Sequence, residues 1–100
     1  MDKEFVFVFD SVNIAIKAEH CLLEHNVQVG VIPLPSQLRA GCGICLRVSV
    51  DCISAAITIL TETLSKVQLS KIVLYSRTKD NELYLYEEEN TSLTGCETGC

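Results

Sequence analysis

The chain has 100 residues, 48% of them apolar, and carries a net charge of −5 from 13 acidic and 8 basic residues. This length suits one domain that buries a core without disulfides or a structural metal. The acidic balance, with no stripe of basic residues, argues against nucleic acid and anionic membranes as partners. No stretch reaches the roughly 18 apolar residues of a membrane span. The apolar run near the N-terminus is too short for a secretion signal, so we expect a cytoplasmic protein with mostly reduced cysteines.

The first expected elements are a buried strand and an amphipathic helix. Residues 4–9, Glu-Phe-Val-Phe-Val-Phe, are aromatic and β-branched without a helical period, which is typical of a buried strand. Asp10 or Ser11 then supplies the capping oxygen of a helix that runs from Val12 to about Asn26. Its buried face is predicted from residues that recur at spacings of three and four, namely Ile14, Ala18, Cys21, Leu22 and His25.

Two strands follow, separated by a loop with two prolines and two glycines. Residues 27–33 alternate between apolar and polar or small residues, and Pro33 and Pro35 end this strand. Residues 44–50 alternate cleanly, with Cys45, Arg47 and Ser49 on the face opposite the aliphatic residues. We therefore expect one face of the sheet to be open to solvent or to a partner.

The second half of the chain repeats the pattern of a helix followed by a strand. Asp51 is expected to cap a helix whose buried stripe is Ile53, Ala56, Ile57, Leu60 and Leu64. Residues 71–76 form a fourth strand, Asn81 marks a turn, and residues 82–87 are expected to pair back as a hairpin.

The order β-α-β-β-α-β predicts an α+β, ferredoxin-like fold with an antiparallel sheet, two helices on one face and a possible extra C-terminal strand. We expect residues 1–88 to form this single domain and residues 89–100 to form a mobile acidic tail that contains cysteines. Because this fold hosts many unrelated functions, it does not decide the activity.

The chain contains six cysteines, and Cys42-Gly43-Ile44-Cys45 is a C-x-x-C motif. A thioredoxin-type dithiol needs its first cysteine at a helix N-terminus, whereas this motif runs directly into a strand. A zinc site would combine Cys42 and Cys45 with Cys96 and Cys100. A core of this size does not need a structural metal, so we expect none.

A third interpretation treats Cys42 alone as a nucleophile or carrier thiol. Arg39 and Arg47 would favour its thiolate, and Gly41 and Gly43 would give access and unusual backbone angles. The plain alternative is that the glycines only make a turn and the arginines only solvate it. The remaining cysteines divide into two kinds: Cys21 and Cys52 are expected to fill the core, and Cys96 and Cys100 are either inert or relay sulfur to and from Cys42.

The segment around Cys42 resembles a known family. Phe5 to Asp10 with Ser11, then Pro33-Leu-Pro35, then Cys42-Gly43-Ile44-Cys45-Leu46-Arg47 are similar to the putative selenium/sulfur carrier protein-like family, over roughly residues 4 to 75. The resemblance implies that Cys42 carries sulfur or selenium as a persulfide or selenopersulfide, with Gly43 beside it and Arg47 as the matching cation. The chain departs from the family pattern where Ser36-Gln37-Leu38 precede Arg39, and where Cys45 stands in place of a small apolar residue.

Our sequence prediction is therefore a carrier protein rather than a turnover enzyme, and it requires no cofactor. Cys42 would accept a chalcogen from a cysteine desulfurase-type donor and pass it to an acceptor protein, and an edge strand makes a homodimer plausible. One alternative is a non-catalytic ferredoxin-like interaction or regulatory module with incidental thiols, which binds through a sheet face bearing Tyr84, Tyr86 or Arg47. The other is a small zinc-binding domain with cysteine ligands.

Overall fold

The computed structural model describes residues 3–38, 43–81 and 83–89, and it orders eight elements along the chain. These are β1 (Lys3–Val8), α1 (Val12–Glu24), β2 (Gly30–Pro33), β3 (Ile44–Ser49), α2 (Ile53–Thr63), α3 (Lys66–Ser70), β4 (Val73–Asp80) and β5 (Leu83–Glu88). The expected tail lies outside the described residues except for Glu89, as do Arg39, Gly41 and Cys42.

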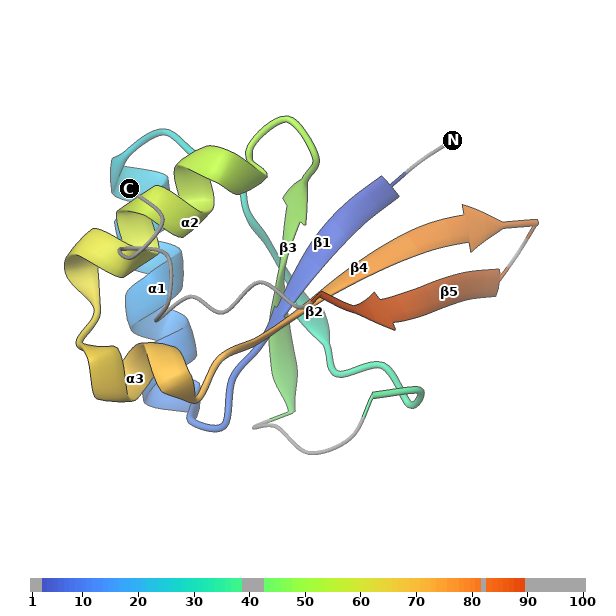
Figure 1. Ribbon diagram of the computed structural model, residues 1–100, viewed down its shortest axis with the longest axis horizontal. Coiled ribbons are helices and arrows are strands. Elements are labelled where there is room, and N and C mark those ends of the chain that lie inside the picture. The colour runs from blue at the N-terminus through green and yellow to red at the C-terminus, as the bar shows by residue number, and fades with distance from the viewer. Residues whose placement is uncertain (1–2, 39–42, 82, 90–100) are drawn as a thin grey trace.

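The five strands form one antiparallel sheet in the order β2-β3-β1-β4-β5. Figure 1 shows the three helices together on one side of this sheet. The first four strands have the ferredoxin-like order, and β5 is added at the edge next to β4. The predicted α+β ferredoxin-like fold with an extra C-terminal strand is therefore confirmed, while the short α3 is a third helix that was not expected.

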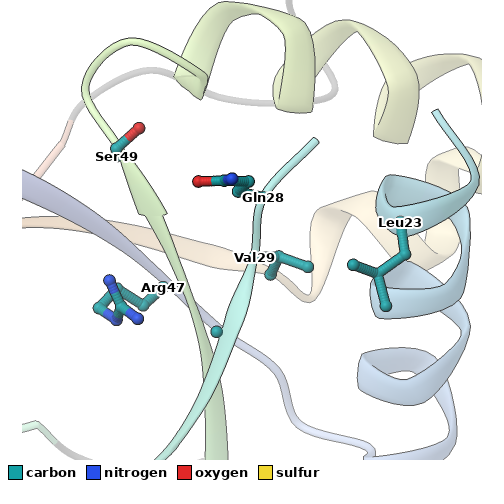
Figure 2. A pocket seen from close by; sticks show the side chains of 6 residues that line it. Leu23, Gln28, Val29, Arg47 and Ser49 are labelled. Carbon is teal, nitrogen blue, oxygen red and sulfur yellow. The ribbon is translucent and has the colours of Figure 1, made fainter. Parts of the chain in front are cut away.

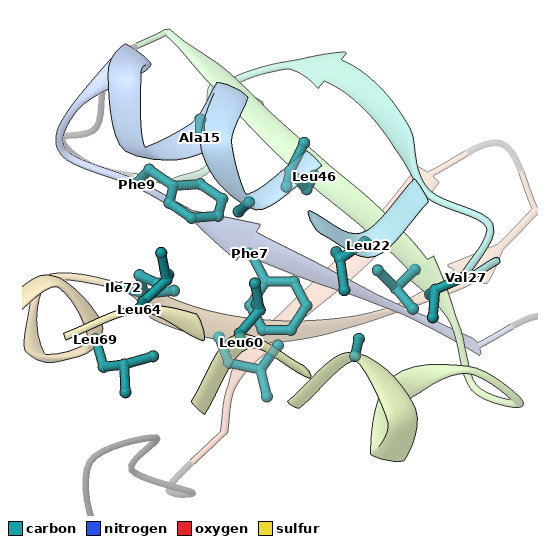
Figure 3. Packing of buried hydrophobic residues seen from close by; sticks show 14 residues of the cluster. Phe7, Phe9, Ala15, Leu22, Val27, Leu46, Leu60, Leu64, Leu69 and Ile72 are labelled. Atoms are coloured by element: carbon teal, nitrogen blue, oxygen red, sulfur yellow. The ribbon is translucent and has the colours of Figure 1, made fainter. Parts of the chain in front are cut away.

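The central strand β1 is buried on both faces, which explains its unbroken apolar sequence. Phe7, and Phe9 just beyond the strand, point to the helices and join the main core with Leu22 of α1 and Leu60 of α2 (Figure 3). Val6 and Val8 point to the opposite face of the sheet and belong to a second, smaller cluster. A strand with two buried faces needs no polar alternation, and β1 shows none between Phe5 and Phe9.

The second cluster is covered by the segment that follows β2 rather than by a helix. Leu38 packs there against Val6, Val8 and Cys45 and is itself only 8% exposed. Leu34 and Tyr75 are partly buried against the same group. The expectation of an open face on β3 is therefore wrong at Cys45, which is fully buried, whereas Ser49 at the other end of the strand is exposed.

Helix α1 ends earlier than its sequence pattern suggested, and this shortens β2. Asn26 has a positive φ of 63°, and the Val27 amide donates to the carbonyl of Leu22 while the Asn26 amide donates to that of Leu23. This is the hydrogen-bond pattern of a Schellman turn, in which the left-handed residue follows the helix end. Val27 therefore packs into the main core from the turn, and the strand begins only at Gly30.

Two expectations about helix faces and caps are corrected. His25 is exposed rather than buried, because it lies at the end of α1, where its ring Nδ1 bonds the Cys21 carbonyl oxygen at 2.8 Å. Cys52, not Asp51, occupies the N-cap position of α2. Ser65 caps α3 through a complete capping box with Gln68, which gives this five-residue helix its start.

Candidate functional site

The predicted site residues divide between described and undescribed parts of the chain. Cys42, with Arg39 and Gly41 before it, lies outside the described residues, and so do Cys96 and Cys100. Gly43, Cys45 and Arg47 are described, and they lie at or near the start of β3. The site is therefore built from the two described residues that hold the ends of the loop that contains Cys42. These two anchors are Gly43 and Leu38.

Gly43 is the described neighbour of Cys42, and its backbone requires glycine. Its φ is +98°, a conformation that side chains with a Cβ rarely adopt. No heavy atom would lie within 4 Å of a Cβ placed on it, so the requirement comes from the backbone and not from crowding. The Gly43 carbonyl accepts a hydrogen bond of 3.0 Å from the Leu34 amide, which joins the two ends of the loop.

The other anchor of the loop is Leu38, four residues before Cys42. The Leu38 amide donates to the Pro35 carbonyl at 3.0 Å, forming a turn that brings the Leu38 side chain onto the second cluster. A pocket of about 430 Å³ lies beside this anchor and is lined by Gln37, Leu38, Leu85 and three tyrosines, Tyr75, Tyr84 and Tyr86. An apolar, aromatic pocket therefore adjoins the last described residue before the loop.

Cys45 is fully buried on the helix-free face of the sheet. It pairs in register with Val8 of β1 on one side and Ile32 of β2 on the other. Leu38 belongs to the same cluster and packs over this face. Because thiol exchange needs an accessible sulfur, this burial favours a packing role for Cys45. The prediction that Cys45 assists Cys42 stays a prediction.

Arg47 takes part in an ion-pair network that sequence reasoning missed. Its Nη1 donates to Glu4 Oε2 at 2.9 Å, and Arg77 donates from Nε and Nη2 to Glu4 Oε1 at 2.9 and 2.8 Å. One carboxylate on β1 thus serves two guanidinium groups from β3 and β4. Glu4 and Arg77 are opposite each other in the β1–β4 register, so only the strand pairing, not the sequence spacing, could have joined them.

The network continues onto β5. Arg77 Nη1 donates to the Tyr86 hydroxyl at 3.0 Å, and the guanidinium lies 4.0 Å from the centre of the Tyr84 ring. Burial raises the pKa of Glu4, but the hydrogen bonds and charges of Arg77 and Arg47 outweigh it and hold that pKa below its ordinary value. The carboxylate is therefore ionised whenever the network is intact.

Arg47 is directed away from Gly43, the described neighbour of Cys42. At about 3.3 Å per residue, a strand separates the Cα atoms of Gly43 and Arg47 by roughly 13 Å. The Arg47 side chain turns toward Glu4, whose register partner on β3 is Ser49, farther still from Gly43. The predicted stabilisation of a Cys42 thiolate by Arg47 stays a prediction. The contact that the structure shows for the Arg47 guanidinium is its ion pair with Glu4.

The described ranges contain neither a candidate metal site nor a candidate membrane-spanning helix. Among residues 3–38, 43–81 and 83–89, no three histidine, cysteine or acidic side chains are grouped so that they could hold a metal ion. Three of the four cysteines in the zinc alternative, Cys42, Cys96 and Cys100, lie outside these ranges, and the fourth is Cys45. None of the described helices is both long enough and apolar enough to cross a bilayer.

Comparison with known proteins places the chain in one family. Residues 4–74 match the family described as putative Se/S carrier protein-like, and the chain therefore belongs to it. The match begins in β1 and ends in β4, so it includes the Cys42 loop and both of its anchors, and β5 lies beyond it. Among curated proteins and among solved structures, no significant match to the chain is found.

Proposed function

Because the chain belongs to this Se/S carrier family, we propose that it carries sulfur or selenium on the thiol of Cys42, as a persulfide or selenopersulfide. A carrier family implies partner proteins that load and unload the cargo. The single observation that carries the assignment to Cys42 is the pair of anchors around it. The loop is closed by the Leu34–Gly43 hydrogen bond and held to the sheet by Leu38.

The burial of Cys45 supports the choice of Cys42, and not Cys45, as the carrier thiol of the C-x-x-C motif. A carrier thiol must meet a sulfur atom held by another protein, and Cys45 has 0% exposure beneath Leu38. A fully buried thiol cannot make that encounter without local opening. In this proposal Gly43 sets the backbone direction after Cys42, and Cys45 fills the second cluster.

The proposed transfer is a thiol exchange with no net oxidation. The Cys42 thiolate attacks the outer sulfur of a persulfide on a cysteine desulfurase-type donor, forming a new S–S bond as the donor's S–S bond breaks. The donor cysteine leaves as a thiolate, and the outer sulfur ends on Cys42. Unloading is the same exchange, with a nucleophile of the acceptor protein attacking that sulfur and the Cys42 thiolate leaving.

A relay through the tail is compatible with the position of Glu89, the last described residue. The Glu89 amide donates to the Leu74 carbonyl at 2.9 Å, which places it beside β4. Through Phe7, which pairs with both Leu74 and Leu46, this row of the sheet extends to β3. Across the sheet, three strand spacings of about 4.8 Å separate Glu89 from Leu46. Along β3, the three residues from Leu46 back to Gly43 add about 3.3 Å each.

Because the strand spacings and the strand direction are perpendicular, the direct separation between Glu89 and Gly43 is roughly 17 Å. Cys96 follows Glu89 by seven residues, which span up to about 24 Å when extended. The chain is therefore long enough for Cys96 or Cys100 to exchange with Cys42. We include this relay in the proposal as a secondary route for the cargo.

The test is intact-protein mass spectrometry after incubation with a cysteine desulfurase and cysteine. We expect a sulfur adduct on the wild-type chain and none on Cys42→Ser. Cys21→Ser is the matched control, since it removes a half-buried thiol from α1 and should load normally. The double variant Cys96→Ser/Cys100→Ser should still load once, on Cys42.

Loading of Cys42→Ser at the wild-type level would refute the assignment. If neither protein gains an adduct, the interaction-module alternative becomes the better account, and the tyrosine-lined pocket beside Leu38 is its most suitable surface. In that case Tyr84→Ala should weaken partner capture, whereas Cys42→Ser should not.

A further inference from the structure

The ladder between β2 and β3 stops early and leaves a notch at the edge of the sheet. In the described part of this ladder, Gly30 opposite Arg47 is the first pair. Beyond it the chain before β2 and the end of β3 enclose a pocket of about 370 Å³. We call this pocket the β2 notch, and its lining is Leu23, Gln28, Val29, Gly30, Arg47 and Ser49 (Figure 2).

Gly30 brings the Arg47 guanidinium to the β2 notch. A Cβ placed on Gly30 would lie 2.6 Å from Arg47 Nη2 and 3.2 Å from Cζ, so the guanidinium lies over the bare backbone of Gly30. Any larger residue would push it away. The φ of Gly30 is not in the left-handed region, so glycine matters here for the position of the Arg47 guanidinium and not for the backbone. Ser49 and Gln28 add a hydroxyl and an amide to the same pocket.

The charge at the β2 notch is positive. Arg47 and Arg77 share the single carboxylate of Glu4, which leaves one positive charge uncompensated within these three residues. The Arg77 side chain is 9% exposed and stacked on Tyr84, whereas the Arg47 side chain is 39% exposed. A ligand therefore meets this charge at Arg47, on a protein that is acidic as a whole.

The other wall of the β2 notch is apolar. Leu23 of α1 is 51% exposed, and Figure 2 shows its side chain and that of Val29 pointing toward one another. The same view places Arg47 on the far side of β3 and the Gln28 side chain between the chain before β2 and β3. The notch thus combines hydrogen-bond donors at one end with aliphatic carbon at the other, the usual composition of a small-ligand site.

We propose that the β2 notch binds an organic carboxylate with a short branched apolar group. The carboxylate oxygens accept hydrogen bonds from Arg47, and the apolar group contacts Leu23 and Val29. A guanidinium fork is matched to a carboxylate in both charge and geometry. The ligand is either a free acid or the C-terminal carboxylate of a polypeptide, and the site is independent of the cargo proposed for Cys42.

The first test is an NMR titration of the full chain with 3-methylbutanoate, with 3-methylbutanamide as its neutral isostere. We expect saturable shifts of the amides of Gln28, Val29, Gly30 and Ser49. The amide ligand should bind at least tenfold more weakly, because it loses the charge-assisted hydrogen bonds. Equal binding of acid and amide, or no saturable shift at these residues, would overturn the proposal.

Two variants separate the position of the guanidinium from its charge. Arg47→Gln should weaken binding at least tenfold. Gly30→Ala keeps the charge and a backbone that alanine tolerates, yet its Cβ displaces Arg47, so it should weaken binding by a similar factor. Lys79→Gln, which removes an exposed cation of β4 that does not line the notch, is the matched control and should bind normally. Normal binding by both Arg47→Gln and Gly30→Ala would refute the assignment.

The source of the carboxylate is decided by a third comparison. A peptide that ends in valine with a free carboxylate is titrated beside the same peptide with a C-terminal amide. If the acid peptide binds at least tenfold more tightly than 3-methylbutanoate, the ligand is a polypeptide terminus; if it binds no better, the ligand is a free acid. Failure of both acids to bind contradicts the proposal, and none of these outcomes depends on sulfur loading.

Discussion

Replacing Glu4 by glutamine should destabilise the protein through the Arg47–Glu4–Arg77 network. The carboxylate accepts three charge-assisted hydrogen bonds, two of them from Arg77, which is 8% exposed. Breaking a fully buried ion pair costs about 3–5 kcal/mol, and an exposed pair contributes about 0–1 kcal/mol. With Glu4 a quarter exposed, we expect Glu4→Gln to lower the free energy of unfolding by about 2 kcal/mol.

The pH dependence of this loss identifies its cause. Because the folded-state pKa of Glu4 is lowered, its contribution is complete above the unfolded-state pKa of about 4.3 and is lost as the pH falls through the folded-state value. The gap between wild type and Glu4→Gln should therefore be widest near pH 7 and close as the pH falls below about 4.

Urea unfolding at a series of pH values measures both effects. A loss of about 2 kcal/mol corresponds to a melting temperature lower by roughly 10 °C for a domain of this size. Glu24→Gln, which changes an exposed carboxylate on α1, is the matched control and should alter stability by less than about 0.5 kcal/mol. If Glu4→Gln costs no more than this control, or if its cost is the same at pH 7 and pH 3, the reasoning about the network is refuted.

Two further predictions concern the anchors of the Cys42 loop. Gly43→Ala should lower the free energy of unfolding by about 1–2 kcal/mol through backbone strain alone, since its φ is +98° and nothing crowds the site; a cost below 0.5 kcal/mol in urea unfolding would contradict this. Leu38→Ala should cost about 2–3 kcal/mol and make Cys45 react with a thiol reagent in the native protein, as read by peptide mapping. Unchanged protection of Cys45 would show that Leu38 is not its cover.

Much of the fold could be predicted because local patterns and tertiary packing agree there. The alternation of residues 44–50 placed Ile44 and Cys45 on opposite faces, and the structure puts them in different clusters. The prediction failed where the hydrogen bonds that end a helix decided the outcome. Val27 fits a strand by its alternation, but the Schellman turn after α1 takes it into the core instead.

The candidate site was less predictable, because its interactions join distant parts of the chain. Glu4 and Arg77 are 73 residues apart, and no spacing rule connects them. Cys45 was expected on an open face because the alternation of residues 44–50 contains no information about a distant segment that packs on the sheet. Only the tertiary structure, in which Leu38 joins the cluster that contains Cys45, shows that this thiol is buried, and a single aliphatic residue in a proline-rich loop carries no such signal.

The shortness of β2 has a consequence for motion. β2 has four residues and ends in a proline that lacks an amide hydrogen, and among the described strands it pairs with β3 alone, whereas β1 is paired on both sides from Glu4 to Val8. Amide exchange of Val31 and Ile32 should therefore proceed through a local opening of far lower free energy than the global unfolding that exposes Val6 and Phe7. Detachment of β2 breaks its ladder with β3 and the Leu34–Gly43 hydrogen bond beside it, while the rest of the sheet stays folded.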